Sequence, residues 1–256
     1  MDTNTGTVQI SMLGTFTIRH GGRQVSESVF RDTRSWQLMK YLADNRGRAV
    51  NQSELVRVLW TPESFGPDVV GTLRVRLRRL RESLNAVGLG SSRDGLVLYA
   101  QERFFFNPDY DVVTDTQQLY ELCRQAENHA LGRELRLAAC QRGLSLCGGP
   151  YLEHSAPAPW VEAGRREVQE LFAALARVTL ELSGQSGSCE LVRELAPRAL
   201  SLIPEDEGLN TQIMTFLMQH GCVAEAVAHY ARLSRVTEAK GDPDPPLTAF
   251  YMAQER

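Results

Sequence analysis

The chain has 256 residues, of which 43% are hydrophobic and 23% charged, a balance typical of a folded globular protein that excludes a wholly disordered one. This length favours two domains of about 100–150 residues each. The sequence has neither an apolar run long enough to cross a membrane nor a basic and apolar leader. We therefore expect a cytoplasmic protein with no membrane partner.

The net charge of −3 argues by itself against a nucleic-acid partner, but the charge is divided unevenly along the chain. Residues 1–107 contain 15 Arg and Lys against 10 Asp and Glu, whereas residues 108–256 contain 13 against 21. A basic first part followed by an acidic second part indicates a polyanion-binding domain joined to a domain with another task.

The first elements along the chain are predicted to be strands. Residues 8–13 and 15–18 are rich in β-formers with partial alternation of apolar and polar side chains. Gly21 and Gly22 then supply the positive φ angles of a tight hairpin turn before a strand at 24–25.

Three helices and a second hairpin follow. Apolar spacing predicts helices from about residue 33 to Asn45, from 50 to 60, and from 69 to 85. Strands at 96–99 and 103–106 flank a predicted three-residue turn. Strands, three helices and a hairpin make a winged helix-turn-helix, an α+β domain that we predict to span residues 1–107.

The helix at 69–85 carries the clearest functional pattern. Its apolar positions repeat at spacings of three and four and predict a buried stripe of Val70, Leu73, Leu77, Leu80 and Leu84. On a helical wheel the residues facing away from this stripe are Thr72, Val75 and Arg79, and those on its flanks are Arg74, Arg76, Arg78 and Arg81. Such a helix suits the major groove, where Arg reads guanine edges and other Arg contact phosphates.

The alternative interpretation of this helix is a solvated charged face. Five arginines between positions 74 and 81, with one neighbouring acid at Glu82, favour DNA contact, because an ordinary surface helix mixes both signs. Arg103, beside Gln101 on the second hairpin, is a candidate wing contact. The start of the first helix offers further phosphate donors in Arg31, Arg34 and Ser35.

The second part, residues 108–256, is predicted to be all-α. We expect helices near 115–130, 133–147, 160–183, 188–203, 206–220 and 222–239, and a short one near 246–254. Helix pairs of roughly 34 residues resemble tetratricopeptide-type repeats, which commonly bind protein partners.

The sequence carries no recognisable catalytic, cofactor or metal motif. The five cysteines, at 123, 140, 147, 189 and 222, contain no CxxC pair, and we interpret each as a small buried hydrophobe with no disulfide framework. The five histidines lack paired-ligand spacing, and no phosphate-binding loop occurs. We therefore predict a protein that is not an enzyme and holds neither a cofactor nor a metal.

Several motifs resemble those of one known family, the Streptomyces antibiotic regulatory proteins. Residues 73–81 (LRVRLRRLR) are similar to the recognition helix of response-regulator-type winged helices, and residues 38–42, 47–50 and 55–60 look like this family in particular. Residues 111–115, 148–152, 160–162, 165–166 and 230–233 look like its bacterial transcriptional activator domain. The order of these motifs covers nearly the whole chain.

The resemblance implies an activator that binds direct repeats in double-stranded promoter DNA and recruits RNA polymerase through its sigma or alpha subunit. By position it implies that Thr72, Val75 and Arg79 face bases and that Arg76, Arg78 and Arg81 contact phosphates. The chain departs from the family at Gly71, where a basic residue is common, and in the shortened segment at 239–246.

A second function class stays open at this point. In it the helical repeats act as a protein-interaction scaffold and the winged helix does not bind DNA, since a fold does not fix a function. The sequence also leaves the oligomeric state open, including a homodimer.

Overall fold

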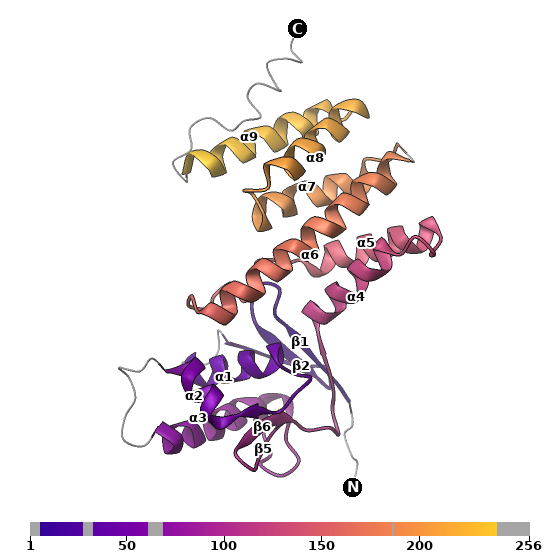
Figure 1. Ribbon diagram of the computed structural model, residues 1–256. Helices are drawn as coiled ribbons and strands as arrows, with labels where there is room; N and C mark the ends of the chain where they lie inside the picture. Colours follow the sequence, from indigo (N-terminus) through magenta and orange to yellow (C-terminus); the bar gives the residue numbers. More distant parts are fainter. Residues whose placement is uncertain (1–5, 28–32, 61–68, 186, 240–256) are drawn as a thin grey trace. The chain divides into compact units, whose positions relative to one another are not determined.

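The computed structural model describes residues 6–27, 33–60, 69–185 and 187–239 (Figure 1). The chain divides into two compact units, one of residues 1–116 and 152–156, the other of residues 117–151 and 157–256. Arg31, the predicted helix near 246–254 and the shortened segment from 240 onward lie outside the described residues.

A four-stranded sheet opens the first unit. Its strands are β1 (Thr7–Ser11), β2 (Thr17–His20), β3 (Arg23–Ser26) and β7 (Asp111–Thr114), in the order β3-β2-β1-β7. The predicted turn at Gly21 and Gly22 is confirmed, since both have positive φ angles of 54° and 75°. Alternate side chains of β1, Val8 and Ile10, are buried and make one face of the sheet apolar.

Strand β7 lies beyond the domain boundary expected at 107/108. It pairs in parallel with β1, with Val112 opposite Val8, and so extends the first unit to residue 116. Asp115, the residue directly after β7, accepts hydrogen bonds from the backbone N–H groups of Met12 (2.8 Å) and Leu13 (3.0 Å). A four-residue strand whose partner lies about a hundred residues away leaves too little periodicity to be predicted locally.

The short segment 152–156 also packs in the first unit. The backbone N–H of Leu152 donates to the carbonyl of Met12 (2.7 Å). The side chain of Leu152 is fully buried, and its backbone has a positive φ of 46°. The buried Lys40 donates through Nζ to Ser155 Oγ (2.7 Å) and forms an ion pair with the half-buried Glu27. These non-local contacts explain why the unit boundary is not a single point in the sequence.

The rest of the first unit is a helical triad with a hairpin. The helices are α1 (Thr33–Asp44), α2 (Gln52–Leu59) and α3 (Val69–Leu84), followed by a 3₁₀ turn, η3 (Asn85–Val87). A three-stranded sheet of order β4-β6-β5 contains β4 (Val50–Asn51), β5 (Val97–Ala100) and β6 (Arg103–Phe106). The predicted three helices and hairpin of a winged helix-turn-helix are therefore present.

Two details of this prediction were wrong. The second helix begins at Gln52 rather than Val50, because Val50 and Asn51 pair with Phe104 and Arg103 as a strand. The hairpin turn has two residues rather than three, because Ala100 pairs with Arg103 and leaves only residues 101 and 102 in the turn. Both turn residues have positive φ angles, 49° and 59°, as a two-residue turn between twisted strands requires.

The second unit is helical throughout its described residues. Its helices are α4 (Asp115–Glu127, entering from the first unit), α5 (Arg133–Leu146), α6 (Pro159–Gly184), α7 (Glu190–Leu202), α8 (Glu207–Gln219) and α9 (Val223–Ala239). All six lie within a few residues of their predicted bounds. Neighbouring helices pack on one another in chain order, α5 on α6, α6 on α7 and α8, and α8 on α9 (Figure 1). The predicted fold class is confirmed.

The interpretation of all five cysteines as separate buried hydrophobes was wrong for two of them. Cys189 and Cys222 are joined by a disulfide, whereas Cys123, Cys140 and Cys147 are free and buried. Helices α7 and α9 begin 33 residues apart and pack on one another, and a cysteine precedes each helix. This packing brings the two cysteines together, which a search for short cysteine motifs does not detect.

The packing of α6 gives a testable prediction. We expect Gly164→Ala to lower the free energy of unfolding by about 1–3 kcal/mol, because overpacking a buried contact forces neighbours to shift. The new methyl carbon would lie 2.6 Å from Cε1 and 2.8 Å from Cζ of the buried Tyr151 ring. Urea unfolding measures the loss.

Gly184→Ala in the same helix is the matched control. Its methyl carbon would lie 3.8 Å from Phe216 Cε2, an ordinary contact, and alanine favours a helix over glycine. The control should be as stable as the wild type or more so. Equal stabilities of the two variants would contradict the close packing of α6 on Tyr151.

Candidate nucleic-acid interface

Helix α3 is oriented by its leucines. Leu73, Leu77, Leu80 and Leu84 are all buried, with exposed fractions of 4% or less, and they hold α3 against the core beside α1. Val70, predicted to extend this stripe, is half-buried at the first turn. With the stripe buried, the rotation of α3 about its own axis is fixed, and the opposite side chains face outward.

The outward face of α3 is basic with one apolar residue in its middle. Arg74, Arg78 and Arg79 are exposed, and Val75 between them has 48% of its surface exposed. Thr72, one turn earlier, is half-buried. An exposed valine surrounded by arginines has no role in the core, and it suits contact with an apolar group such as a thymine methyl.

The flanking arginines differ in how firmly they are held. Arg78 Nε donates to Glu82 Oε1 (3.0 Å), but both side chains are mostly exposed, so this pair is weak and open to competition. Arg76 is half-buried, and its backbone carbonyl accepts a hydrogen bond from Ser35 Oγ (3.0 Å), which ties α3 to the start of α1.

Arg81 is placed in the packing of the hairpin. It is half-buried, its Nη2 donates to the carbonyl oxygen of Val97 (3.0 Å), and burial lowers the pKa of its guanidinium. The bond joins the last turn of α3 to β5. The family resemblance implies a phosphate contact for Arg81, which stays a prediction, and the structure shows that Arg81 also supports the hairpin.

The remaining predicted site residues, Arg103 and Arg34, lie outside α3, on the hairpin and on α1. Arg103 is exposed at the first position of β6, next to the two turn residues Gln101 and Glu102. Arg34 is exposed in the first turn of α1, with its guanidinium carbon 5.9 Å from the ring centre of the buried Trp60. Both keep a cation at the surface of the first unit.

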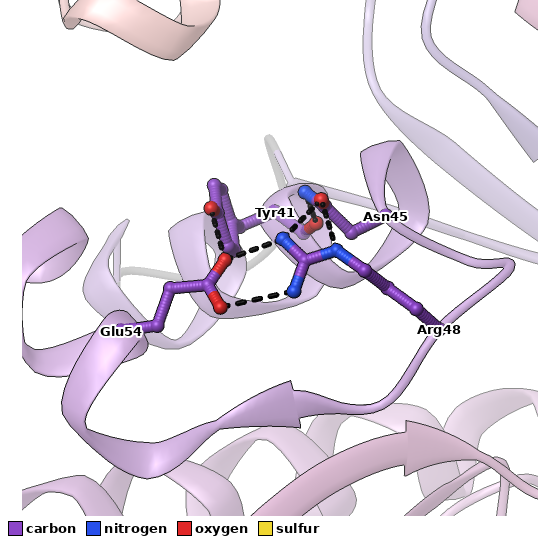
Figure 2. Close-up of polar contacts among 4 residues, drawn as sticks. All are labelled: Tyr41, Asn45, Arg48 and Glu54. Carbon is purple, nitrogen blue, oxygen red and sulfur yellow. Dashed lines mark hydrogen bonds and ion pairs between the residues drawn. The ribbon is translucent and has the colours of Figure 1, made fainter.

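A polar cluster that the sequence analysis missed fixes the corner between α1 and α2. The guanidinium of Arg48 donates to both carboxylate oxygens of Glu54 and to Asn45 Oδ1, and the Tyr41 hydroxyl donates to Glu54 Oε1 (2.6 Å), as Figure 2 shows. The hydrogen bonds from Arg48 lower the pKa of Glu54 to about 2. Burial raises the pKa of Tyr41.

The hairpin is tied to the start of α2 as well. The backbone N–H of Gln52 donates to the carbonyl of Glu102 (2.8 Å), and the Tyr99 hydroxyl donates to Gln52 Oε1 (2.6 Å). Together with Arg81 these bonds hold the hairpin, α2 and α3 in one geometry. The side chains that project from α3 and from β6 are therefore presented by a single preorganised body.

Comparison with known proteins identifies the second part of the chain. The family model described as "Bacterial transcriptional activator domain" matches residues 114–253, more than half of the sequence. The chain belongs to the bacterial transcriptional activator domain family. The match begins in β7 and covers α4 to α9, the helical elements described above.

A solved structure of Mycobacterium tuberculosis EmbR, described as a complex with a low-affinity phosphopeptide, is similar to both parts of the chain. The likeness has a TM-score of 0.65 and 18% sequence identity over 94% of this chain. It covers 62% of the EmbR chain, so this protein spans less than two thirds of EmbR. At this identity the likeness shows the fold. A search of curated proteins found no match.

These findings confirm the predicted resemblance to a Streptomyces antibiotic regulatory protein-type regulator. The activator domain is shown by the family model, and the succession of an α/β region and a helical region by the shared fold. Among the described residues, no helix is long and apolar enough to span a membrane, and no three His, Cys, Asp or Glu side chains are grouped as metal ligands.

The cluster in Figure 2 gives a testable prediction about the α1–α2 corner. We expect Glu54→Gln to lower the free energy of unfolding at pH 7 by about 1–2 kcal/mol, because a charge-assisted double hydrogen bond is replaced by a neutral one. The pKa of Glu54 is depressed from an unfolded value of about 4.3. Its contribution is therefore complete above pH 5 or so and is lost as the pH falls through about 2.

Urea unfolding of wild type and variant between pH 7 and pH 3 measures this contribution. The stability difference should be constant at the upper end and shrink toward the lower end. Glu82→Gln, which removes only the exposed pair with Arg78, serves as the control and should leave the stability unchanged. A wild-type advantage that does not depend on pH would contradict the role of the Glu54 charge.

Proposed function

We propose that this protein is a sequence-specific DNA-binding transcriptional activator whose helix α3 enters the major groove of promoter DNA. The observation that carries the proposal is the outward face of α3, where Arg74, Arg78 and Arg79 surround the exposed Val75 while the leucine stripe is buried. A solvent-exposed helix face with no ligand commonly mixes positive and negative side chains, whereas this face is mainly positive.

The positions on α3 divide the work between specificity and affinity. Arg79, Val75 and Thr72 project from the ridge opposite the leucines and read base edges. Arg74, Arg76 and Arg78 flank that ridge and contact phosphates, which fixes the register without reading sequence. Arg103 on the hairpin and Arg34 at the start of α1 add phosphate contacts on either side of α3. Arg81 supports the hairpin.

The acidic second part explains how a protein with a net negative charge can still bind DNA through its first part. The basic residues concentrate in the first 107 positions, where they attract the phosphate backbone, and the acidic excess lies in the activator domain. An acidic domain is repelled by DNA and stays available to a protein partner. We propose RNA polymerase, through its sigma or alpha subunit, as that partner in the cytoplasm.

The base-reading role of Arg79 is tested by titrating full-length protein onto a duplex from its own upstream region and onto scrambled duplexes. We expect Arg79→Ala to weaken binding to the specific duplex by about 1–3 kcal/mol and to narrow the gap between specific and scrambled DNA. A bidentate contact to a guanine edge is worth that amount of discrimination.

The phosphate role of Arg74 predicts a different signature in the same titration. Arg74→Ala should weaken all duplexes alike and reduce the slope of log K against log salt by about 1, because one fewer counterion is released. Arg142→Ala, an exposed arginine of the activator domain, is the control and should bind as wild type. Wild-type binding by both Arg79→Ala and Arg74→Ala would remove α3 from the DNA interface, and a wild-type protein that binds no duplex would favour the scaffold function.

A further inference from the structure

The cysteines that precede α7 and α9 occupy equivalent positions in successive helical units. Cys189 and Cys222 are joined by a disulfide, with their Cα atoms 7.2 Å apart and a sequence separation of 33. Each carbonyl accepts the first hydrogen bond of its helix, from Arg193 N (2.9 Å) and Ala226 N (3.1 Å) respectively. Both sulfurs therefore stand at a helix N-terminus.

The other three cysteines have a different environment. Cys123, Cys140 and Cys147 have exposed fractions of 0–3%, against 8% for both Cys189 and Cys222. Burial raises the pKa of Cys123 to about 12 and also raises that of Cys140, which keeps these thiols protonated. Thiol reactivity follows thiolate character, so Cys123 and Cys140 are inert packing groups. Cys147 is buried as they are.

Two features favour a thiolate at the paired cysteines instead. The N-terminal end of a helix carries a partial positive charge that favours a thiolate. The guanidinium of Arg193 lies beside Cys222, with its Nη2 3.8 Å from Cys222 Sγ, and the ion pair of its Nε with Glu225 Oε1 (2.8 Å) holds it there. In the reduced protein Cys222 is thus the better nucleophile of the two.

We propose that Cys189 and Cys222 form a reversible thiol–disulfide site, which staples the starts of α7 and α9 when oxidised and releases them when reduced. The oxidant is a low-molecular-weight disulfide of the glutathione class. The Cys222 thiolate attacks one of its sulfurs and expels one small thiol. The Cys189 thiolate then attacks Cys222 Sγ in this mixed disulfide and expels the second. Two electrons pass to the small disulfide, and the two protons of the protein thiols end on the two small thiols.

The consequence concerns the described helices α7 to α9 of the activator domain. A disulfide between successive units closes a loop that contains α7 and α8, and so removes conformational freedom from the opened state of this segment. Stacked helices contact mainly their neighbours, so the bond acts on the local opening of α9, the last helix that the structure describes. The bond therefore controls how often α9 separates from the units before it. This inference goes beyond DNA binding and does not depend on it.

The redox chemistry is tested on the full-length protein in buffers of defined reduced and oxidised glutathione. Differential alkylation followed by peptide mass analysis should show Cys189 and Cys222 losing their free thiols together, in one two-electron transition, while Cys123, Cys140 and Cys147 stay alkylatable after unfolding in every buffer. Cys189→Ser and Cys222→Ser should each abolish the transition, and Cys147→Ala should leave it in place. Independent titration of the two thiols, or a different pairing, would overturn the proposal.

The staple itself is tested by hydrogen exchange on the same samples. Backbone amides of α9 should exchange at least tenfold faster in the reduced than in the oxidised wild type, because loop closure disfavours local opening. The two serine variants should match the reduced wild type in both buffers. Exchange of α9 that is the same in both redox states would overturn the staple. Failure of DNA binding leaves both readouts unchanged, so the two proposals can fail separately.

Discussion

The burial of four leucines on one side of α3 is the constraint on which the candidate interface depends. Leu73, Leu77, Leu80 and Leu84 fix the rotation of the helix, and every other side chain of α3 takes its direction from them. Two hydrogen bonds then anchor the helix along its length, from Ser35 to the carbonyl of Arg76 and from Arg81 to the carbonyl of Val97. A base-reading residue is useful only if its backbone does not move, because each contact must meet a donor or acceptor within a fraction of an ångström.

Local periodicity was enough to predict most of the elements. The leucine stripe, the Gly21–Gly22 turn and the six helices from α4 to α9 are each encoded within a few turns of chain, and all are present. The features that were missed depend on partners far away in sequence. Strand β7 needs β1, strand β4 needs β6, and residues 152–156 need the end of β1. Segments this short carry no pattern of their own, so only the folded chain identifies them.

The sequence predicted which residues make up the candidate site more fully than it predicted how they are arranged. Spacing alone separated the outward Val75 and Arg79 from the buried leucines. It did not distinguish Arg78, exposed beside Glu82, from Arg81, which is half-buried against the hairpin. Nor did it find the Arg48–Glu54 cluster that sets the angle between α1 and α2, because ion pairs around a corner leave no periodic trace. The Cys189–Cys222 bond was missed for a related reason, since it depends on the packing of α7 on α9 rather than on a short motif.

The claim that α3 contacts DNA bases is tested most directly by photocrosslinking from position 75. A photoreactive amino acid replaces Val75 in full-length protein, and the same amino acid at Val223, on α9, is the reference because both valines are 48% exposed. We expect position 75 to crosslink to bases within the bound site of the upstream duplex. Unlabelled specific DNA should suppress these crosslinks, and their yield should be well above that from position 223. Equal yields from the two positions, under conditions where the protein binds the duplex, would contradict the placement of α3 in the major groove.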